Sequence, residues 1–98
     1  YFTVGFMLDK EEVQITKGIT SYPNPINDRV YLNIEGYQQE KMEFEIYDLQ
    51  GKVVLSREQQ MTSDSEIVEL NLDGQLKGIY FLNVHTEGLK FNKKLIKL

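Results

Sequence analysis

Apolar and polar residues alternate with a period of two along most of the chain, and this pattern is the strongest constraint on the fold. The apolar positions fall in four clear sets: Val30, Leu32 and Ile34; Met42, Phe44 and Ile46; Val68, Leu70 and Leu72; and Tyr80, Leu82 and Val84. Such alternation is typical of antiparallel strands that have one face on a core and the other in solvent. The helix-forming patch at residues 38–41 is too short to form a helix alone. The chain is therefore predicted to be all-β.

Turn-forming residues separate these segments, mostly at intervals of about ten residues. This spacing favours a sandwich or a barrel, and we expect an antiparallel β-sandwich. The predicted strands lie at residues 18–23, 30–35, 41–48, 52–58, 65–72, 78–86 and 89–97.

Composition excludes several classes of protein. The chain has 98 residues, enough for one domain, and no cysteine, so it has neither disulfides nor thiolate zinc sites. No apolar run reaches the ~20 residues that a membrane helix needs. The net charge of −4 argues against nucleic-acid binding through a basic surface. The charges are unevenly placed, because all 15 acidic residues precede residue 90 and four lysines follow in the last nine positions.

The first residues suggest a piece of a longer polypeptide. Residues 1–8 are mostly apolar and do not begin with Met, and a charged stretch follows at residues 9–12. We expect residues 1–17 to be the end of an upstream domain plus a linker, and residues 18–98 to be a second domain. A solvated turn between two strands is an equally good interpretation of the charged stretch. The polar segment at residues 9–20 is the expected position of any proteolytic cut.

No set of residues points to catalysis, to a metal or to a cofactor. His85 is the one histidine, and the alternation places it on the outer face of its strand. It has no second histidine or cysteine with which to build a zinc site or a nucleophile–base pair. Outer-face carboxylates such as Glu43 and Glu45 are expected to be solvated, whereas acid catalysis needs a desolvated carboxyl in a cleft. The chain is predicted not to be an enzyme.

Two prolines flank an asparagine early in the chain, where Tyr22, Pro23, Asn24 and Pro25 follow one another. Each proline fixes its φ angle and lacks a backbone donor, so this segment cannot lie in a helix interior or a central strand. It predicts a rigid bend before the strand at residues 30–35.

Three further motifs follow the bend. They are a hairpin with Gly51 and Lys52 at residues 46–54, a strand with Gly78 and Tyr80 at residues 76–84, and a basic ending with Lys93, Lys94 and Lys97 at residues 91–97. Each motif is common by itself. All four in this order, running to the last residue, resemble the type A C-terminal sorting domain of type IX secretion, over residues 22–98.

The resemblance implies an Ig-like antiparallel β-sandwich of about seven strands that acts as a secretion signal. The type IX translocon would read the domain and export a covalently linked upstream cargo protein from the periplasm across the outer membrane. A sortase would then remove the domain or attach the cargo at the cell surface, so the cargo would be secreted or held on the outer cell surface. No cofactor, nucleic acid or membrane span is implied.

The resemblance also implies which residues the translocon recognises: Pro23, Asn24, Pro25, Gly51, Lys52, Gly78, Tyr80, Lys93, Lys94 and Lys97. Backbone conformation gives a second reason for the two glycines in this set. Gly51 is expected to need a positive φ in a four-residue turn, and Gly78 to permit a tight start to a core strand.

The basic ending has two interpretations as well. Lysines on an edge strand commonly discourage strand addition, but a basic edge could also dock an acidic translocon component. The ammonium groups of Lys93, Lys94 and Lys97 are expected to face solvent. Phe91 and Leu95 are expected in the core, and Ile96 is left open.

The alternative function is a free-standing Ig-like adhesion or carbohydrate-binding module. Tyr31, Tyr37 and Tyr47 are candidates for outward-facing rings that could stack on sugars. Tyrosine is also common in strands without any binding role, and this second interpretation is favoured.

Overall fold

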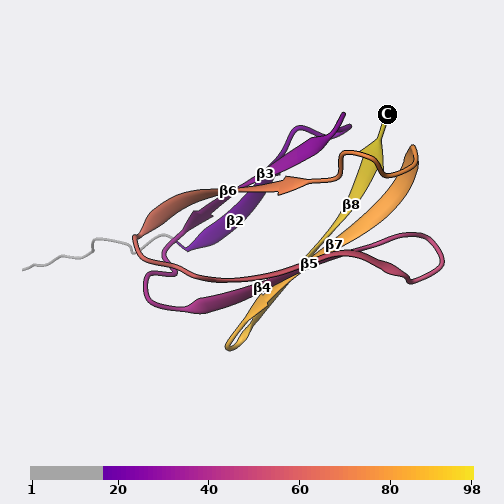
Figure 1. Cartoon of the computed structure of the whole chain (residues 1–98). Helices are drawn as coiled ribbons and strands as arrows, with labels where there is room; N and C mark the ends of the chain where they lie inside the picture. The colour runs from indigo at the N-terminus through magenta and orange to yellow at the C-terminus, as the bar shows by residue number, and fades with distance from the viewer. Residues whose placement is uncertain (1–16) are drawn as a thin grey trace, which may run out of the picture.

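The computed structural model describes residues 17–98, and these form seven antiparallel strands in two facing sheets with no helix among them (Figure 1). The strands are β2 (Gly18–Tyr22), β3 (Arg29–Glu35), β4 (Lys41–Tyr47), β5 (Val53–Gln60), β6 (Ser65–Asn71), β7 (Gly78–Thr86) and β8 (Leu89–Lys97). One sheet has the order β2-β3-β6 and the other β5-β4-β7-β8. The predicted Ig-like β-sandwich is confirmed, and every predicted strand boundary lies within two residues of the observed one.

The expected end of an upstream domain and its linker, at residues 1–17, lie outside the described residues apart from Lys17. The Lys17 Nζ atom lies 5.2 Å from the centroid of the Tyr37 ring and 3.7 Å from Glu40 Oε2. Both partners belong to the connection between β3 and β4. The residue before β2 is therefore held against the β3–β4 connection, one of those that link the two sheets.

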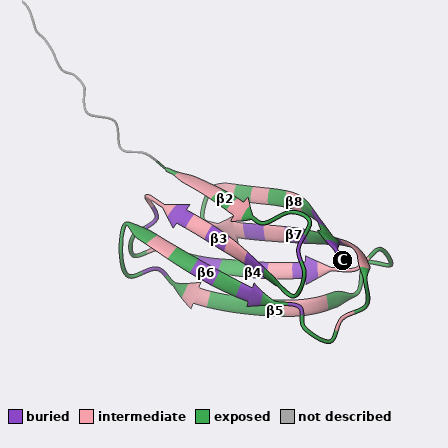
Figure 2. Ribbon diagram, turned by 90° about the horizontal axis from the view of Figure 1, so that it is seen from above, coloured by how far each residue is buried: buried purple, intermediate pink, exposed green. Residues whose placement is uncertain are grey.

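One core fills the space between the sheets, and it is built from the apolar sets that the alternation singled out. In Figure 2, buried residues alternate with intermediate ones along β3 and with exposed ones in the second half of β6. The largest fully buried side chain is that of Phe44 on β4, which is 0% exposed, as are Leu82 on β7 and Leu95 on β8. Complete burial of each such side chain stabilises the fold by roughly 1.5–3 kcal/mol. The core therefore includes the last strand of the domain.

Strand register decides which loops share an end of the sandwich. Tyr47 lies opposite Phe81, and Gly78 lies opposite Lys97. The turn after β4, the start of β7 and the end of β8 therefore lie at one end of the four-stranded sheet. The β7–β8 hairpin and the connection before β4 lie at the other end, because Thr86 pairs with Leu89 and Glu43 with His85.

The two sheets are also joined along one side by a polar contact. Arg57 on β5 donates from Nη1 to the Glu69 carbonyl oxygen on β6 at 2.9 Å, and from Nη2 to Gln59 Oε1 at 2.8 Å. β5 and β6 are edge strands of different sheets. This contact ties the two edges together on the side of the sandwich away from β8.

A core truncation should separate buried from exposed positions. Replacing Leu82 with alanine removes a side chain with no exposed area and should lower the free energy of unfolding by roughly 2–5 kcal/mol. Replacing Ile67, which is 63% exposed on β6, should change it by about 0.5 kcal/mol or less. Urea denaturation followed by tyrosine fluorescence would measure both, and equal losses would contradict the position of the core.

Candidate recognition surface

The proline-flanked bend lies on the outer edge of β8, and Asn24 holds it there. The Asn24 Nδ2 atom donates to the Lys94 carbonyl oxygen at 3.1 Å, and the Ile96 amide donates to Asn24 Oδ1 at 3.2 Å. The side chain thus uses its donor and its acceptor as a backbone peptide would. Residues 70 or more positions apart in sequence are joined by one amide group.

The backbone continues this contact beyond Asn24. The Ile26 amide donates to the Ile96 carbonyl oxygen at 2.7 Å, and the Leu98 amide donates to the Ile26 carbonyl oxygen at 2.8 Å. These two bonds form a short parallel bridge between Ile26 and Lys97. The Ile26 side chain is fully buried, so it anchors the bend, while Pro23 and Pro25 remain exposed. We call residues 24–26 the clasp.

Lys97 does not face solvent, and the expectation that its ammonium group would do so is wrong. The residue is 7% exposed, and its Nζ lies 3.6 Å from Asp28 Oδ1. An isolated buried ammonium is costly, and an ion pair reduces that cost. Alternation along β8 explains the burial, because Lys97 shares the inner face with Leu95. The position of Lys97 beside Asp28, which lies between the clasp-forming bend and β3, could not be predicted from the sequence.

The other lysines of β8 are divided between the two faces. Lys90 and Lys94 are exposed on the outer face, and Lys93 is half-buried on the inner face. Phe91 packs against the core and Leu95 is buried, as expected, whereas Ile96 is 39% exposed and faces outward. The basic ending is therefore a strand with lysines on both faces.

The turn after β4 explains the pair Gly51 and Lys52 locally. Asp48 Oδ1 accepts hydrogen bonds from the backbone amides of Gln50 and Lys52, both at 2.9 Å. Gly51 has a φ of +84°, in the region that glycine adopts most easily, as the sequence predicted. Lys52 is exposed at the tip. Gly51 therefore supplies the backbone conformation of the turn, and the Lys52 side chain is free to contact a partner.

Gly78 and Tyr80 serve the interior of the fold. Gly78 has a φ of +143° at the first position of β7. Tyr80 is 5% exposed, and its hydroxyl donates to the Leu76 carbonyl oxygen at 2.6 Å. A tyrosine that bonds to the backbone a few residues upstream resembles the tyrosine corner of Ig-like sandwiches. These two residues shape the start of β7 from within.

The structure brings most of the sequence-predicted residues to one end of the sandwich. The clasp and the end of β8 are in direct contact, and Gly78 pairs with Lys97. The turn at Gly51 lies at the same end but on the far side of the four-stranded sheet, because β4 and β7 separate β5 from β8. Two separate patches result, one at the clasp and the end of β8 and the other at the turn of Gly51.

The three tyrosines that were candidates for sugar stacking do not form a common platform. Tyr37 is buried at 7% exposure, so the expectation that it faces outward is wrong. Tyr31 stacks on the exposed ring of Tyr22, with centroids 5.7 Å apart and planes at 24°. Tyr47 lies on the other sheet, on β4.

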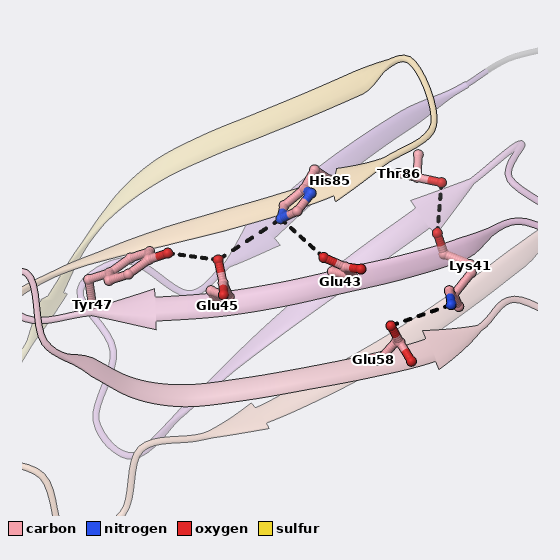
Figure 3. A network of polar contacts seen from close by, with 7 residues as sticks. All are labelled: Lys41, Glu43, Glu45, Tyr47, Glu58, His85 and Thr86. Carbon is pink, nitrogen blue, oxygen red and sulfur yellow. Dashed lines mark hydrogen bonds and ion pairs between the residues drawn. The ribbon is translucent and has the colours of Figure 1, made fainter.

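The outer face of β4 and β7 carries a polar network (Figure 3). His85 Nε2 lies 3.5 Å from Glu43 Oε1 and 3.9 Å from Glu45 Oε1, and the Tyr47 hydroxyl donates to Glu45 at 2.7 Å. The hydrogen bond to Glu45, together with partial desolvation, raises the pKa of the Tyr47 phenol, because only the neutral phenol donates. The Glu43 side chain is 48% exposed and that of Glu45 is 32% exposed. Neither carboxyl is desolvated as an acid catalyst requires.

A hollow of about 440 Å³ lies beside this network, with Glu40, Glu43, Glu87 and His85 in its lining. Within residues 17–98, no group of three or more metal-binding side chains has the geometry to hold an ion. In the same part of the chain, no helix is long and apolar enough to cross a membrane.

Comparison of the sequence with known protein families identifies the family of this domain. The secretion system C-terminal sorting domain family matches residues 20–98, which is nearly the whole of the described sandwich. The chain belongs to this family of sorting domains. It is a type IX secretion signal, which directs an attached cargo protein across the outer membrane. The clasp and β8 both lie within the matched range.

A solved structure has the same fold. The crystal structure of dimeric latent PorU from Porphyromonas gingivalis superposes with a TM-score of 0.58 and 23% identity, over 82% of this chain. The chain spans only 9% of that protein. No curated protein matches the sequence.

Removing the Asn24 amide should loosen the bend. Asn24→Ala loses two hydrogen bonds to β8, each worth about 0.5–1.5 kcal/mol, so the domain should become less stable by roughly 1–2 kcal/mol. The Ile96 amide should also exchange its hydrogen faster. Asn27→Ala, an exposed change next to the clasp, is the matched control. Thermal melting and amide hydrogen exchange would test this, and an unchanged Ile96 exchange rate would contradict the contact.

Proposed function

We propose that this domain is a type A sorting signal whose recognised surface is the clasp together with the exposed side of β8. The observation that supports this is the direct contact between two motifs that lie at opposite ends of the domain sequence. A translocon that binds there reads a surface that exists only in the folded domain. Asn24, Pro25 and Lys94 are exposed on this surface, and Pro23 is exposed directly before the clasp. Lys93 lies at the margin of the surface.

Gly51 and Lys52 form a second contact point in this proposal, and the translocon contacts the Lys52 side chain there. Gly78 and Tyr80 contribute through the fold, since Tyr80 is buried. Lys97 contributes by its ion pair with Asp28, which holds the loop after the clasp against the end of β8.

The proposal extends to the partners and to the fate of the domain. The upstream cargo is linked through residues 1–17, and residues 18–98 act as the signal. After export, a sortase at the cell surface cuts before the sandwich and either releases the cargo or attaches it to the surface. The pairing of β2 with β3 from Gly18 onward supports a start of the signal at residue 18.

Sufficiency is the direct test of the sorting function. Residues 18–98, fused after a periplasmic fluorescent reporter in a bacterium with the type IX machine, should carry the reporter to the cell surface or the medium. The same fusion in a strain that lacks the translocon should stay in the periplasm. Retention of a folded, protease-resistant fusion in the wild-type strain would refute the proposal.

The position of the cut follows from the pairing of β2. Residues 18–20 of the polar segment belong to β2 and pair with β3, so a sortase should cut in the part of the segment before Gly18, within residues 9–17. Mass spectrometry of the released domain would give its first residue. A new terminus within residues 30–98 would contradict the proposed boundary, because it would break the core.

A further inference from the structure

The outer edge of β8 is only partly covered by the rest of the described chain. The clasp contacts β8 through the backbone groups of Lys94, Ile96 and Leu98. Backbone N–H and C=O groups of a strand point alternately to its two sides. The backbone N–H and C=O groups of Lys90 and Asn92 therefore point to the same outer edge. Within residues 17–98, no other segment forms hydrogen bonds with these groups.

The clasp thus acts as a short added strand that stops halfway along β8. Its bridge to Lys97 is parallel, and Pro23 and Pro25 prevent it from continuing as a regular strand. What remains beyond it is an open edge over residues 89–93. An extended segment placed there would lie in line with the clasp and complete the edge of the four-stranded sheet.

The charges along the open edge of β8 restrict which extended segment can pair with it. Lys90 and Lys94 are exposed on the outer face along this edge, and Lys93 is half-buried on the inner face. A second copy of β8 would bring these lysines against its own, which opposes pairing between copies. An acidic strand would instead place its carboxylates beside them, so the lysines select for acidic partners.

We propose that the open edge of β8 at residues 89–93 accepts an extended acidic segment of the translocon by strand addition. This inference rests on the proposed sorting function and adds the mode of recognition. Main-chain hydrogen bonds to Lys90 and Asn92 give the affinity, and the flanking lysines give the preference for acidic side chains. The edge is read through its backbone, so changes in the exposed side chain at Asn92 are tolerated.

Asn92→Pro tests the backbone contact directly. Proline removes the amide that faces the open edge and keeps the pairing with β7, since that amide points away from β7. Asn92→Ala is the matched control, because it removes the same side chain and keeps the amide. In the reporter fusion of residues 18–98, we expect the proline variant to be exported about tenfold less than the parent and the alanine variant to match the parent.

A charge variant gives an independent test that leaves the backbone intact. Lys90→Gln with Lys94→Gln should reduce export severalfold, because both side chains are exposed on the outer face and flank the proposed partner. Lys41→Gln with Lys77→Gln changes the net charge equally at exposed positions outside the open edge at residues 89–93 and should leave export unchanged. Melting curves of all variants establish that each domain is folded.

Amide hydrogen exchange of the purified domain tests whether the edge is open. The amides of Lys90 and Asn92 should exchange much faster than those of Ile96 and Leu98, which the clasp protects. Protection of all four amides in the isolated domain would overturn the proposal, because the edge would already be occupied.

The outcomes separate the two proposals. If the parent fusion is exported and Asn92→Pro is exported equally well, strand addition at this edge is wrong and the sorting function stands. If the proline variant does not fold, the test rests on the variant with both Lys90→Gln and Lys94→Gln. Normal export of that variant refutes the acidic partner. If the parent itself stays in the periplasm, the sorting function fails first, and the edge proposal fails with it.

Discussion

The contact between the clasp and β8 is the interaction on which the rest of this domain depends. β8 is an edge strand that pairs with β7 alone in the sheet, yet it carries the buried Leu95 and Lys97. Without the clasp, the end of β8 would rely on one neighbour for its backbone hydrogen bonds. With it, Ile96 and Leu98 bond on their free side to Asn24 and Ile26. The first and last motifs of the domain therefore stabilise each other.

This arrangement explains why structure and signal are difficult to separate here. Deleting β8 would remove Leu95 from the core and leave Ile26 and Asn24 without partners, so the domain would lose several kcal/mol from a total of only about 5–15 kcal/mol. Loss of export in such a deletion would report unfolding. Exposed residues such as Lys90, Asn92 and Lys94 can be changed with little effect on the core, and they are where recognition can be measured by itself.

The strands could be predicted from the sequence because period-two alternation is a local property of each strand and needs no knowledge of its neighbours. The turn at Gly51 followed for the same reason, since four consecutive residues determine its geometry. The long-range contacts could not be predicted in this way. Nothing local to Asn24 indicates that its amide reaches Lys94 and Ile96, and nothing local to Lys97 indicates that Asp28 lies beside it.

The two wrong expectations, on Tyr37 and Lys97, have a common physical cause. Both residues are amphipathic, and residue type alone does not decide the exposure of such side chains. For Lys97 the alternation along β8 was informative, because Leu95 and Lys97 share a face and the first is plainly apolar. An ammonium group on an inner face then needs an acid within reach, and Asp28, just after the clasp, supplies it. The lysines of this strand therefore have different roles: Lys97 holds the fold together, whereas Lys90 and Lys94 remain available to a partner.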